Sequence, residues 1–244
     1  MAAGGKRVIA RELLGTAQVP GGEELRLYAH GRDFMIVLDR NELMSTRMRG
    51  SEEALAVLSI ERLAGSAAPH LLIGGYGMGF TLRAALAALG PKAKVTVAEL
   101  VPEIIAWARG PMAELTAGCL DDPRLTLRSG DVGDVIREGG GRYDAILLDV
   151  DNGPDGLVRD GNDRIYSRSG LGAAKHALRP GGVLAIWSAA PDPGFARRLA
   201  GAGFVVEEVA VSARGNSPEG KKGKGPRHII WFARKAVQHG VQEI

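Results

Sequence analysis

The stretch from His70 to Arg83 constrains the fold of this chain more than any other. A short apolar run, Leu71–Ile73, ends in four glycines within six positions, and a helix-forming run, Leu82–Leu89, follows. Glycine is needed where a backbone turns sharply and lies against a ligand, because a Cβ atom does not fit there. The free N–H groups of the following helix then face that ligand. The pattern predicts the opening of a nucleotide-binding α/β unit, although a tight turn without a ligand stays open as an alternative.

Strand-like and helix-like segments alternate after the glycine turn, and a helix expected from Ser51, its predicted cap, to about Leu63 precedes it. The expected elements are strands at 94–98, 124–128, 143–148 and 183–187 and helices at 102–115, 132–137, 171–178 and 194–200. Two further strands, 205–211 and 228–233, come last. This alternation predicts an α/β fold with a Rossmann-like sheet of about seven strands, mostly parallel, with helices on both faces. The two successive strands predict an antiparallel C-terminal hairpin.

The first fifty residues have a different pattern. Strand-like runs at 25–30 and 33–39 flank Gly31-Arg32, which predicts a hairpin, and a further short strand is expected at 42–45. We therefore divide the chain into a small antiparallel β appendage (1–48), a larger Rossmann-like domain that contains the glycine turn (49–235) and a flexible tail (236–244). The appendage is too short for a core of its own, so we expect it to pack on the larger domain or on a second subunit.

Composition excludes several classes of protein. A net charge of +3 with 5% aromatic residues argues against a dedicated nucleic-acid binder. No apolar run approaches the roughly 20 residues that span a bilayer, and the N-terminus lacks the apolar stretch of a signal peptide. The single cysteine, Cys119, excludes an internal disulfide framework and a cysteine-based zinc site. We expect a cytoplasmic protein.

Glycine or polar residues follow each of four successive predicted strands, where open α/β sheets bind their ligands. The glycines follow the first strand. Glu99 follows the second, about twenty residues after the glycine turn, where a carboxylate accepts hydrogen bonds from ribose hydroxyls. Asp131 follows the third, and Asp149, Asp151 and Asn152 follow the fourth. Together these strand ends indicate a ligand site more strongly than the glycine turn alone.

Each acid also has a purely structural interpretation. Asp131 could cap the helix that begins at Val132, Asp149 could cap nearby loop N–H groups, and Glu99 could be a solvated strand end. A glycine turn followed by an acid also fits a nicotinamide-dependent dehydrogenase. No Tyr-x-x-x-Lys pair follows it, however, and no catalytic His or Cys is evident, which argues against that interpretation.

Six motifs of this chain resemble those of spermidine synthases, and more generally of class I S-adenosylmethionine-dependent methyltransferases. They are Ile73-Gly74-Gly75-x-Gly77, Val97-Ala98-Glu99-Leu100, Asp122-Pro123-Arg124-Leu125, Gly130-Asp131, Tyr143–Asp149 and Leu178–Gly182. The resemblance covers roughly residues 24–235, the β appendage included. It is specific for the fold and for an adenosyl-sulfonium donor, and much less specific for the group that is transferred.

The resemblance implies roles for the matching residues. Donor binding falls on residues that follow the first three strands, namely Gly74, Gly75, Gly77, Gly79, Glu99, Leu100, Asp131 and Val132. The glycines border the amino-acid or aminopropyl arm of the donor, Glu99 binds the ribose hydroxyls, and Asp131 with Val132 contacts the adenine edge. Asp149 corresponds to the acid that orients and helps to deprotonate the attacking amine.

Three departures from the spermidine synthase pattern bear on the reaction. Gly77 stands where those enzymes carry an Asp that holds the terminal amine of the donor. Asn152 stands where a second acid holds the diamine, although Asp151 is displaced by one residue only. Gly50-Ser51-Glu52 replaces a Tyr-His-Glu motif. Loss of the acid at Gly77 removes repulsion against the carboxylate of intact S-adenosylmethionine, the donor of methyl groups.

Our leading hypothesis from the sequence is therefore a spermidine-synthase-like methyltransferase that acts on an amine of a small molecule. Asp149 is the predicted catalytic residue that takes the proton of the nucleophile, with Asp151, Asn152 and Tyr166 lining the acceptor side. No metal is required for this chemistry. The resemblance and the β appendage favour a homodimer or larger assembly.

Two alternatives remain. The protein could be an aminopropyltransferase (a polyamine synthase) that uses decarboxylated S-adenosylmethionine, with Asp151 replacing the missing acids. It could also be a non-catalytic nucleoside-binding or scaffold protein. The basic segment 214–228 is either a solvated hairpin loop or a lid that closes over an anionic ligand.

Overall fold

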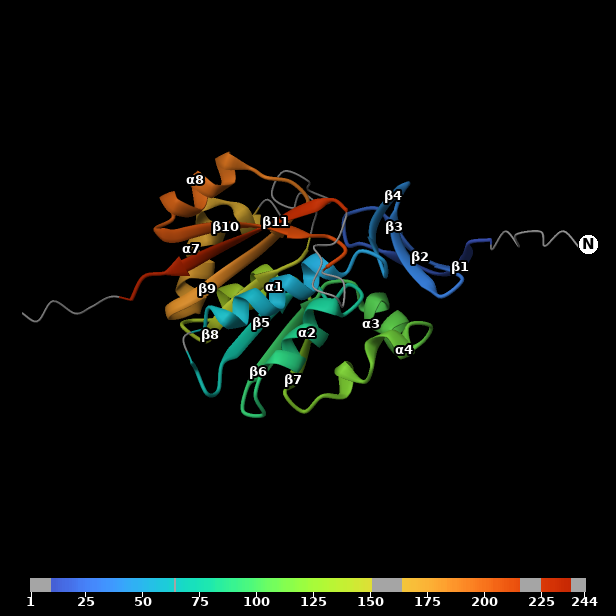
Figure 1. The fold of residues 1–244 in the computed structure, drawn as a ribbon, viewed down its shortest axis with the longest axis horizontal. Helices are drawn as coiled ribbons and strands as arrows, with labels where there is room; N and C mark the ends of the chain where they lie inside the picture. Colours follow the sequence, from blue (N-terminus) through green and yellow to red (C-terminus); the bar gives the residue numbers. More distant parts are fainter. Residues whose placement is uncertain (1–9, 64, 151–163, 216–224, 238–244) are drawn as a thin grey trace, which may run out of the picture.

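The computed structural model describes residues 10–63, 65–150, 164–215 and 225–237. Its N-terminal part is a four-stranded antiparallel sheet, β1 (Glu12–Gln18), β2 (Glu24–His30), β3 (Asp33–Leu38) and β4 (Asn41–Ser45), in that order. This sheet is drawn in blue at one end of the molecule (Figure 1). The predicted hairpin of β2 and β3 is confirmed. β1 was not predicted, because a register shift between Leu13 and Gly15 breaks its alternation of apolar and polar residues.

The larger sheet has the strand order β10-β11-β9-β8-β5-β6-β7. Its strands are β5 (His70–Gly74), β6 (Lys94–Glu99), β7 (Leu125–Ser129), β8 (Tyr143–Leu148), β9 (Leu178–Ser188), β10 (Phe204–Ser212) and β11 (Arg227–Lys235). All are parallel except β11, which runs antiparallel to β9 and β10. The predicted Rossmann-like sheet with an antiparallel C-terminal hairpin is thus confirmed. Strands β8, β5 and β6 are consecutive in this sheet, so their carboxyl ends lie at the same edge.

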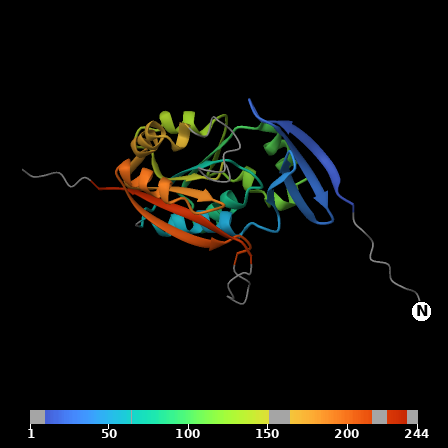
Figure 2. The same ribbon diagram turned by 90° about the horizontal axis from the view of Figure 1, so that it is seen from above.

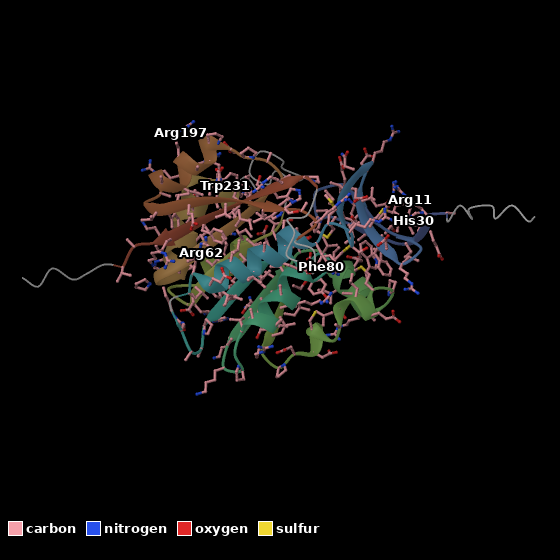
Figure 3. All side chains as sticks on the ribbon, viewed as in Figure 1. Arg11, His30, Arg62, Phe80, Arg197 and Trp231 are labelled. Atoms are coloured by element: carbon pink, nitrogen blue, oxygen red, sulfur yellow. The ribbon has the colours of Figure 1, made fainter. Side chains whose placement is uncertain are left out.

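Helices cover both faces of this sheet (Figures 1 and 2). They are α1 (Gly50–Glu61), α2 (Phe80–Ala88), α3 (Pro102–Arg109), α4 (Ala113–Thr116), α5 (Val132–Arg137), α7 (Arg168–Ala177) and α8 (Pro193–Gly201), with a short 3-10 turn at Cys119–Asp121. One apolar core joins α1, α2, α3 and the N-terminal sheet to one face, and a second joins α5, α7 and α8 to the other. Trp231 lies within the second core, whereas Arg197 points outward from α8 (Figure 3). No helix in the described ranges is long and apolar enough to cross a membrane.

Three local predictions need correction. The helix expected over 102–115 is interrupted between α3 and α4, because Pro111 lacks an N–H and disfavours helical geometry at Gly110. Arg49, not Ser51, occupies the N-cap position of α1, and the Ser51 hydroxyl contacts His228 instead. β9 begins at Leu178 rather than after Gly182, because the backbone pairs with Tyr143 before a register shift.

The start of α1 packs backbone to backbone against the turn that follows β10. The Gly50 N–H donates to the carbonyl of Ala213 at 2.9 Å, and a Cβ atom on Gly50 would overlap the backbone of Gly215 and lie 2.6 Å from the carbonyl carbon of Arg214. This contact leaves no room at Gly50 for the Tyr side chain of the resembling Tyr-His-Glu motif.

We expect Gly50→Ala to lower the free energy of unfolding by about 1–3 kcal/mol, because backbone atoms cannot move aside as a flexible side chain can. Urea denaturation measures the change. Gly172→Ala in α7 is the matched control: nothing lies within 4 Å of its added Cβ, and it should stabilise the protein by about 0.5–1 kcal/mol. Equal stability of the two variants would contradict the packing described here.

Candidate functional site

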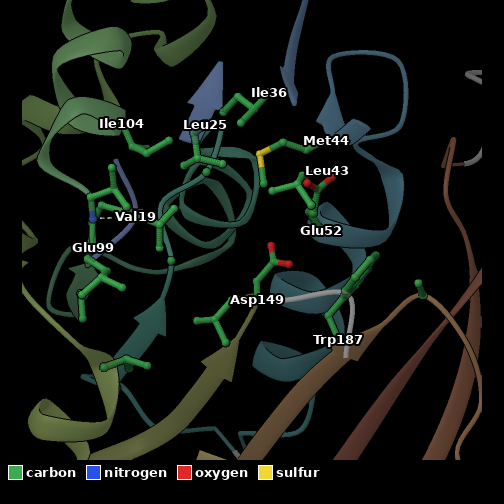
Figure 4. A pocket seen from close by; sticks show the side chains of 18 of the residues that line it. Val19, Leu25, Ile36, Leu43, Met44, Glu52, Glu99, Ile104, Asp149 and Trp187 are labelled. Carbon is green, nitrogen blue, oxygen red and sulfur yellow. Dashed lines mark hydrogen bonds between the residues drawn. The ribbon is translucent and has the colours of Figure 1, made fainter. Parts of the chain in front are cut away.

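A cavity of about 380 Å³ lies where the N-terminal sheet meets the carboxyl ends of β5, β6 and β8 (Figure 4). Asp149 rises into it from the end of β8, opposite Met44 and Leu25 of the N-terminal sheet. The wall from the N-terminal sheet is mostly apolar and includes Val19, Leu25, Ile36, Leu43 and Met44. Its size and its few polar groups are typical of a small-molecule site.

Two of the four predicted glycines line the cavity. Gly75 has φ 84°, and a Cβ there would lie 2.6 Å from the carbonyl oxygen of Asp149. Gly77 has φ 55°, and its Cβ would lie 2.8 Å from the terminal methyl of Met44. Gly74 and Gly79 do not line it: Gly74 is confined by Val132 and Leu148, and Gly79 caps α2 with Tyr76 packed against it. The glycines therefore divide into two that face the cavity and two that fit the turn.

Glu99 lies at the end of β6 and is buried. One carboxylate oxygen accepts the N–H of Tyr76 at 2.7 Å and the other accepts the N–H of Val101 at 2.8 Å (Figure 4 shows Glu99 beside the cavity). Burial raises the pKa of the Glu99 carboxyl, and these backbone N–H groups oppose the rise. Glu99 thus joins the glycine turn to the segment after β6, and with Leu100 it also lines the cavity.

Asp131 is the N-cap of α5 and accepts the N–H of Gly133 at 2.7 Å. The capping role that was open as an alternative is therefore real. Asp131 and Val132 nevertheless both line the cavity, on the side of Glu99 and Leu100. All the predicted donor-binding residues except Gly74 and Gly79 are brought together at the cavity.

Asp149 is paired with a carboxylate that the sequence interpretation missed. Glu52, in the first turn of α1, lines the same cavity, and its Oε2 is buried without a hydrogen-bond partner among the described residues. Burial, followed by the charge of Asp149, raises the pKa of Glu52 well above its usual range. Burial raises the pKa of Asp149 to about 6, partly opposed by the Thr81 hydroxyl, which donates to it at 3.1 Å. Two buried carboxylates with raised pKa values form a site for a proton or for a cationic group.

A signal for Glu52 was present in the sequence. Glu52 keeps the third position of the resembling Tyr-His-Glu motif, while Gly50 and Ser51 replace the first two. An acidic residue in the first turn of a helix is also favoured by the helix dipole, so Glu52 was interpreted as a structural residue rather than a functional one.

The predicted acceptor residues have different outcomes. Asp151 and Asn152 lie outside the described residues, as does most of the basic segment 214–228. Tyr166 is placed in the second apolar core rather than at the cavity, with its ring edge-on to Phe195 at a centroid distance of 5.5 Å. Tyr166 is buried in this core, which also contains Leu171 of α7 and Phe195 of α8.

Acidic side chains dominate the charge of the cavity. Five of the described lining residues carry carboxylates, namely Glu42, Glu52, Glu99, Asp131 and Asp149, and within the described lining there is no Lys or Arg. The cavity therefore favours a ligand with positive charge. A carboxylate on a ligand would meet no Lys or Arg side chain among the described residues that line the cavity.

Comparisons with known proteins agree with this geometry. The chain is 31% identical over 175 residues to a polyamine aminopropyltransferase of Corynebacterium efficiens, a match that covers 66% of this chain and 32% of that protein. It is 31% identical over 173 residues to the Mycobacterium tuberculosis protein of the same name, covering 70% and 30%. A Sulfolobus acidocaldarius relative is 30% identical over 123 residues, covering 50% and 39%. The chain thus spans about a third of the length of these curated relatives. No protein-family profile matches it.

Solved structures show the same fold. Spermidine synthase from Thermotoga maritima superposes with a TM-score of 0.70 at 19% identity, covering 93% of this chain and 74% of that one. A spermidine synthase in complex with the transition-state analogue AdoDATO gives a TM-score of 0.69 at 18% identity, covering 93% and 73%. At these identities the likeness concerns the fold. Taken with the sequence matches, it shows that the chain belongs to the spermidine synthase, or polyamine aminopropyltransferase, family, with its S-adenosylmethionine-dependent methyltransferase-like fold.

Proposed function

We propose that the protein transfers an aminopropyl group from decarboxylated S-adenosylmethionine to an amine of a small molecule. The observation that carries this proposal is the charge of the cavity, which has five carboxylates and no Lys or Arg among its described lining residues. The decarboxylated donor carries a sulfonium and an ammonium group, and no carboxylate. This donor suits an acidic cavity better than intact S-adenosylmethionine does. The named relatives also favour aminopropyl over methyl transfer, the reverse of the order we expected from Gly77.

In the proposed step, the lone pair of the acceptor amine attacks the propyl carbon that is bonded to the donor sulfur. The carbon–sulfur bond breaks with its electron pair on sulfur, 5′-methylthioadenosine leaves, and the product is a secondary ammonium ion. The lone pair becomes available because the acceptor ammonium gives one proton to a carboxylate before the attack. Asp149 is the group for that proton, because it is buried at the end of β8 with a pKa raised to about 6. Glu52 beside it holds the acceptor as its ammonium form before the proton is lost.

The donor arm lies, in this proposal, along the glycine turn. Gly75 and Gly77 let the backbone approach it, Glu99 meets the ribose hydroxyls, and Asp131 with Val132 meets the adenine. The apolar residues of the N-terminal sheet cover the opposite side of the cavity and so exclude water from the reacting groups.

A second candidate, methyl transfer from intact S-adenosylmethionine, is favoured by one observation. The place beside Gly77 that an acid would occupy is filled by the thioether of Met44, so no carboxylate stands there to hold a donor ammonium.

The two donors separate these candidates. We would titrate the protein calorimetrically with each donor and assay each with a panel of primary amines, following 5′-methylthioadenosine and S-adenosylhomocysteine. Tighter binding of the decarboxylated donor and release of 5′-methylthioadenosine are expected. Release of S-adenosylhomocysteine alone would establish the methyl-transfer candidate, and failure of a folded sample to bind either donor would overturn both.

A further inference from the structure

Ser51, Trp187 and His228 form a polar cluster on the cavity wall that the proposed step does not use, which we call the neutral cluster. The Ser51 hydroxyl oxygen lies 2.9 Å from Nδ1 of His228. The His228 ring packs edge-on to the Trp187 indole at a centroid distance of 4.8 Å and an interplanar angle of 79°. The three side chains come from α1, β9 and β11, and all line the cavity. Convergence of three elements fixes the imidazole in position.

This cluster carries hydrogen-bonding groups without negative charge. Burial lowers the pKa of His228, which favours the neutral form of its ring. The groups that face it are Ser51 from α1 and Trp187 from β9, and none of the described carboxylates is hydrogen-bonded or ion-paired with it. With Nδ1 at Ser51, Nε2 is the ring nitrogen left for a ligand. The indole Nε1 of Trp187 is buried and has no hydrogen-bond partner within the described ranges.

The neutral cluster lines the same cavity as the two buried carboxylates Glu52 and Asp149, and Ser51 and Glu52 are consecutive in the first turn of α1. Glu52 and Asp149 can neutralise one ammonium group. A second ammonium group on the same acceptor would meet an imidazole and an indole there, and a buried ammonium without an anionic partner is costly. A hydroxyl or carboxamide group, by contrast, can accept from the indole N–H and pair with Nε2 of the imidazole.

We propose that the acceptor is an amine whose second polar group is uncharged, a hydroxyl or a carboxamide, and that His228 is the positioning residue that receives this group. The inference rests on the proposed function, because it places the reacting amine at Asp149 and Glu52. It separates two substrate classes of equal length, amino alcohols and diamines.

The experiment compares 4-aminobutan-1-ol with 1,4-diaminobutane. Calorimetric titration measures binding of each to the protein alone, and 5′-methylthioadenosine release with the decarboxylated donor measures kcat/KM. The amino alcohol should be preferred by about tenfold, the value of one or two neutral hydrogen bonds. His228→Leu should abolish that preference by weakening the amino alcohol alone, and His228→Gln, which keeps a neutral hydrogen-bonding group, should restore part of it. His176→Gln, at an exposed histidine of α7, is the control.

Preference of the wild-type protein for the diamine would overturn the inference, as would an equal loss for both acceptors in folded His228→Leu. Thermal unfolding of each variant checks that it is folded. Failure of the proposed function is distinguishable, because it would abolish transfer from the decarboxylated donor to either acceptor. The binding titration, which needs no donor, would still decide between the two acceptor classes.

Discussion

Replacing Asp149 by Asn is expected to slow turnover by roughly 10²- to 10⁴-fold while donor affinity changes only slightly. The amide has almost the shape of the carboxylate and can still contact the Thr81 hydroxyl, which lies 3.1 Å from the carboxylate oxygen. It cannot take the proton of the attacking amine. Single-turnover assays with saturating donor measure the loss, and donor titration confirms that the cavity is intact. Asp121→Asn, at an exposed side chain that pairs with Arg109 on the surface, is the control.

The same carboxylate predicts two opposite pH dependences. Turnover needs charged Asp149, so kcat/KM should fall as pH drops through about 6. The free energy of unfolding should have the opposite pH dependence. Because burial raises the pKa of Asp149 from 3.8 to about 6, the folded state binds more protons than the unfolded state between these values. Stability then falls as pH rises through this window. Asp149→Asn should remove that part of the pH dependence, and an unchanged stability profile in this variant would contradict the burial assigned to Asp149.

Replacing Glu52 by Gln is expected to lower kcat/KM for the amine by about a hundredfold, chiefly through a higher KM. Glutamine keeps the volume of the side chain but removes the charge that holds the ammonium group, and loss of one partner of a buried charge pair costs about 2–5 kcal/mol. The donor, which lies along the glycine turn in our proposal, should bind nearly as before.

Glu53→Gln is the control for Glu52→Gln. Glu53 is the next residue on the same helix, but its side chain is 45% exposed and pairs with Arg49 on the surface. Steady-state kinetics at several amine concentrations separates KM from kcat. A similar change in both variants, or an effect of Glu52→Gln on donor binding alone, would contradict a role for Glu52 in holding the acceptor.

The sequence was sufficient to predict the larger sheet and to group at one cavity most of the residues that we assign to the donor. Residues at the ends of parallel strands share one edge of a sheet whatever the details of packing, so the positions of Gly75, Glu99, Asp131 and Asp149 along the chain are enough to group them. Periodic patterns of apolar residues also predicted the order of strands and helices along the chain.

The residues that we assign to the acceptor could not be grouped in the same way. Glu52 and Ser51 come from α1, Trp187 and His228 from β9 and β11, and Met44 from the N-terminal sheet. Their meeting depends on long-range packing, such as the close contact of Gly50 with Gly215, which leaves no periodic signal in the sequence. Tyr166 shows the converse, because an aromatic residue near a predicted site belongs to the core.

The division of the cavity between two sheets has a consequence for how such a protein can change. The larger sheet supplies Glu99, Asp131 and Asp149, while β2, β3 and β4 of the N-terminal sheet supply mainly apolar surface above them. Exchanging side chains such as Leu25, Ile36 or Met44 alters the shape of the space without disturbing the groups assigned to chemistry. We therefore expect substitutions within the first 48 residues to change which acceptors fit the cavity, and those positions are where a library for altered acceptors should begin.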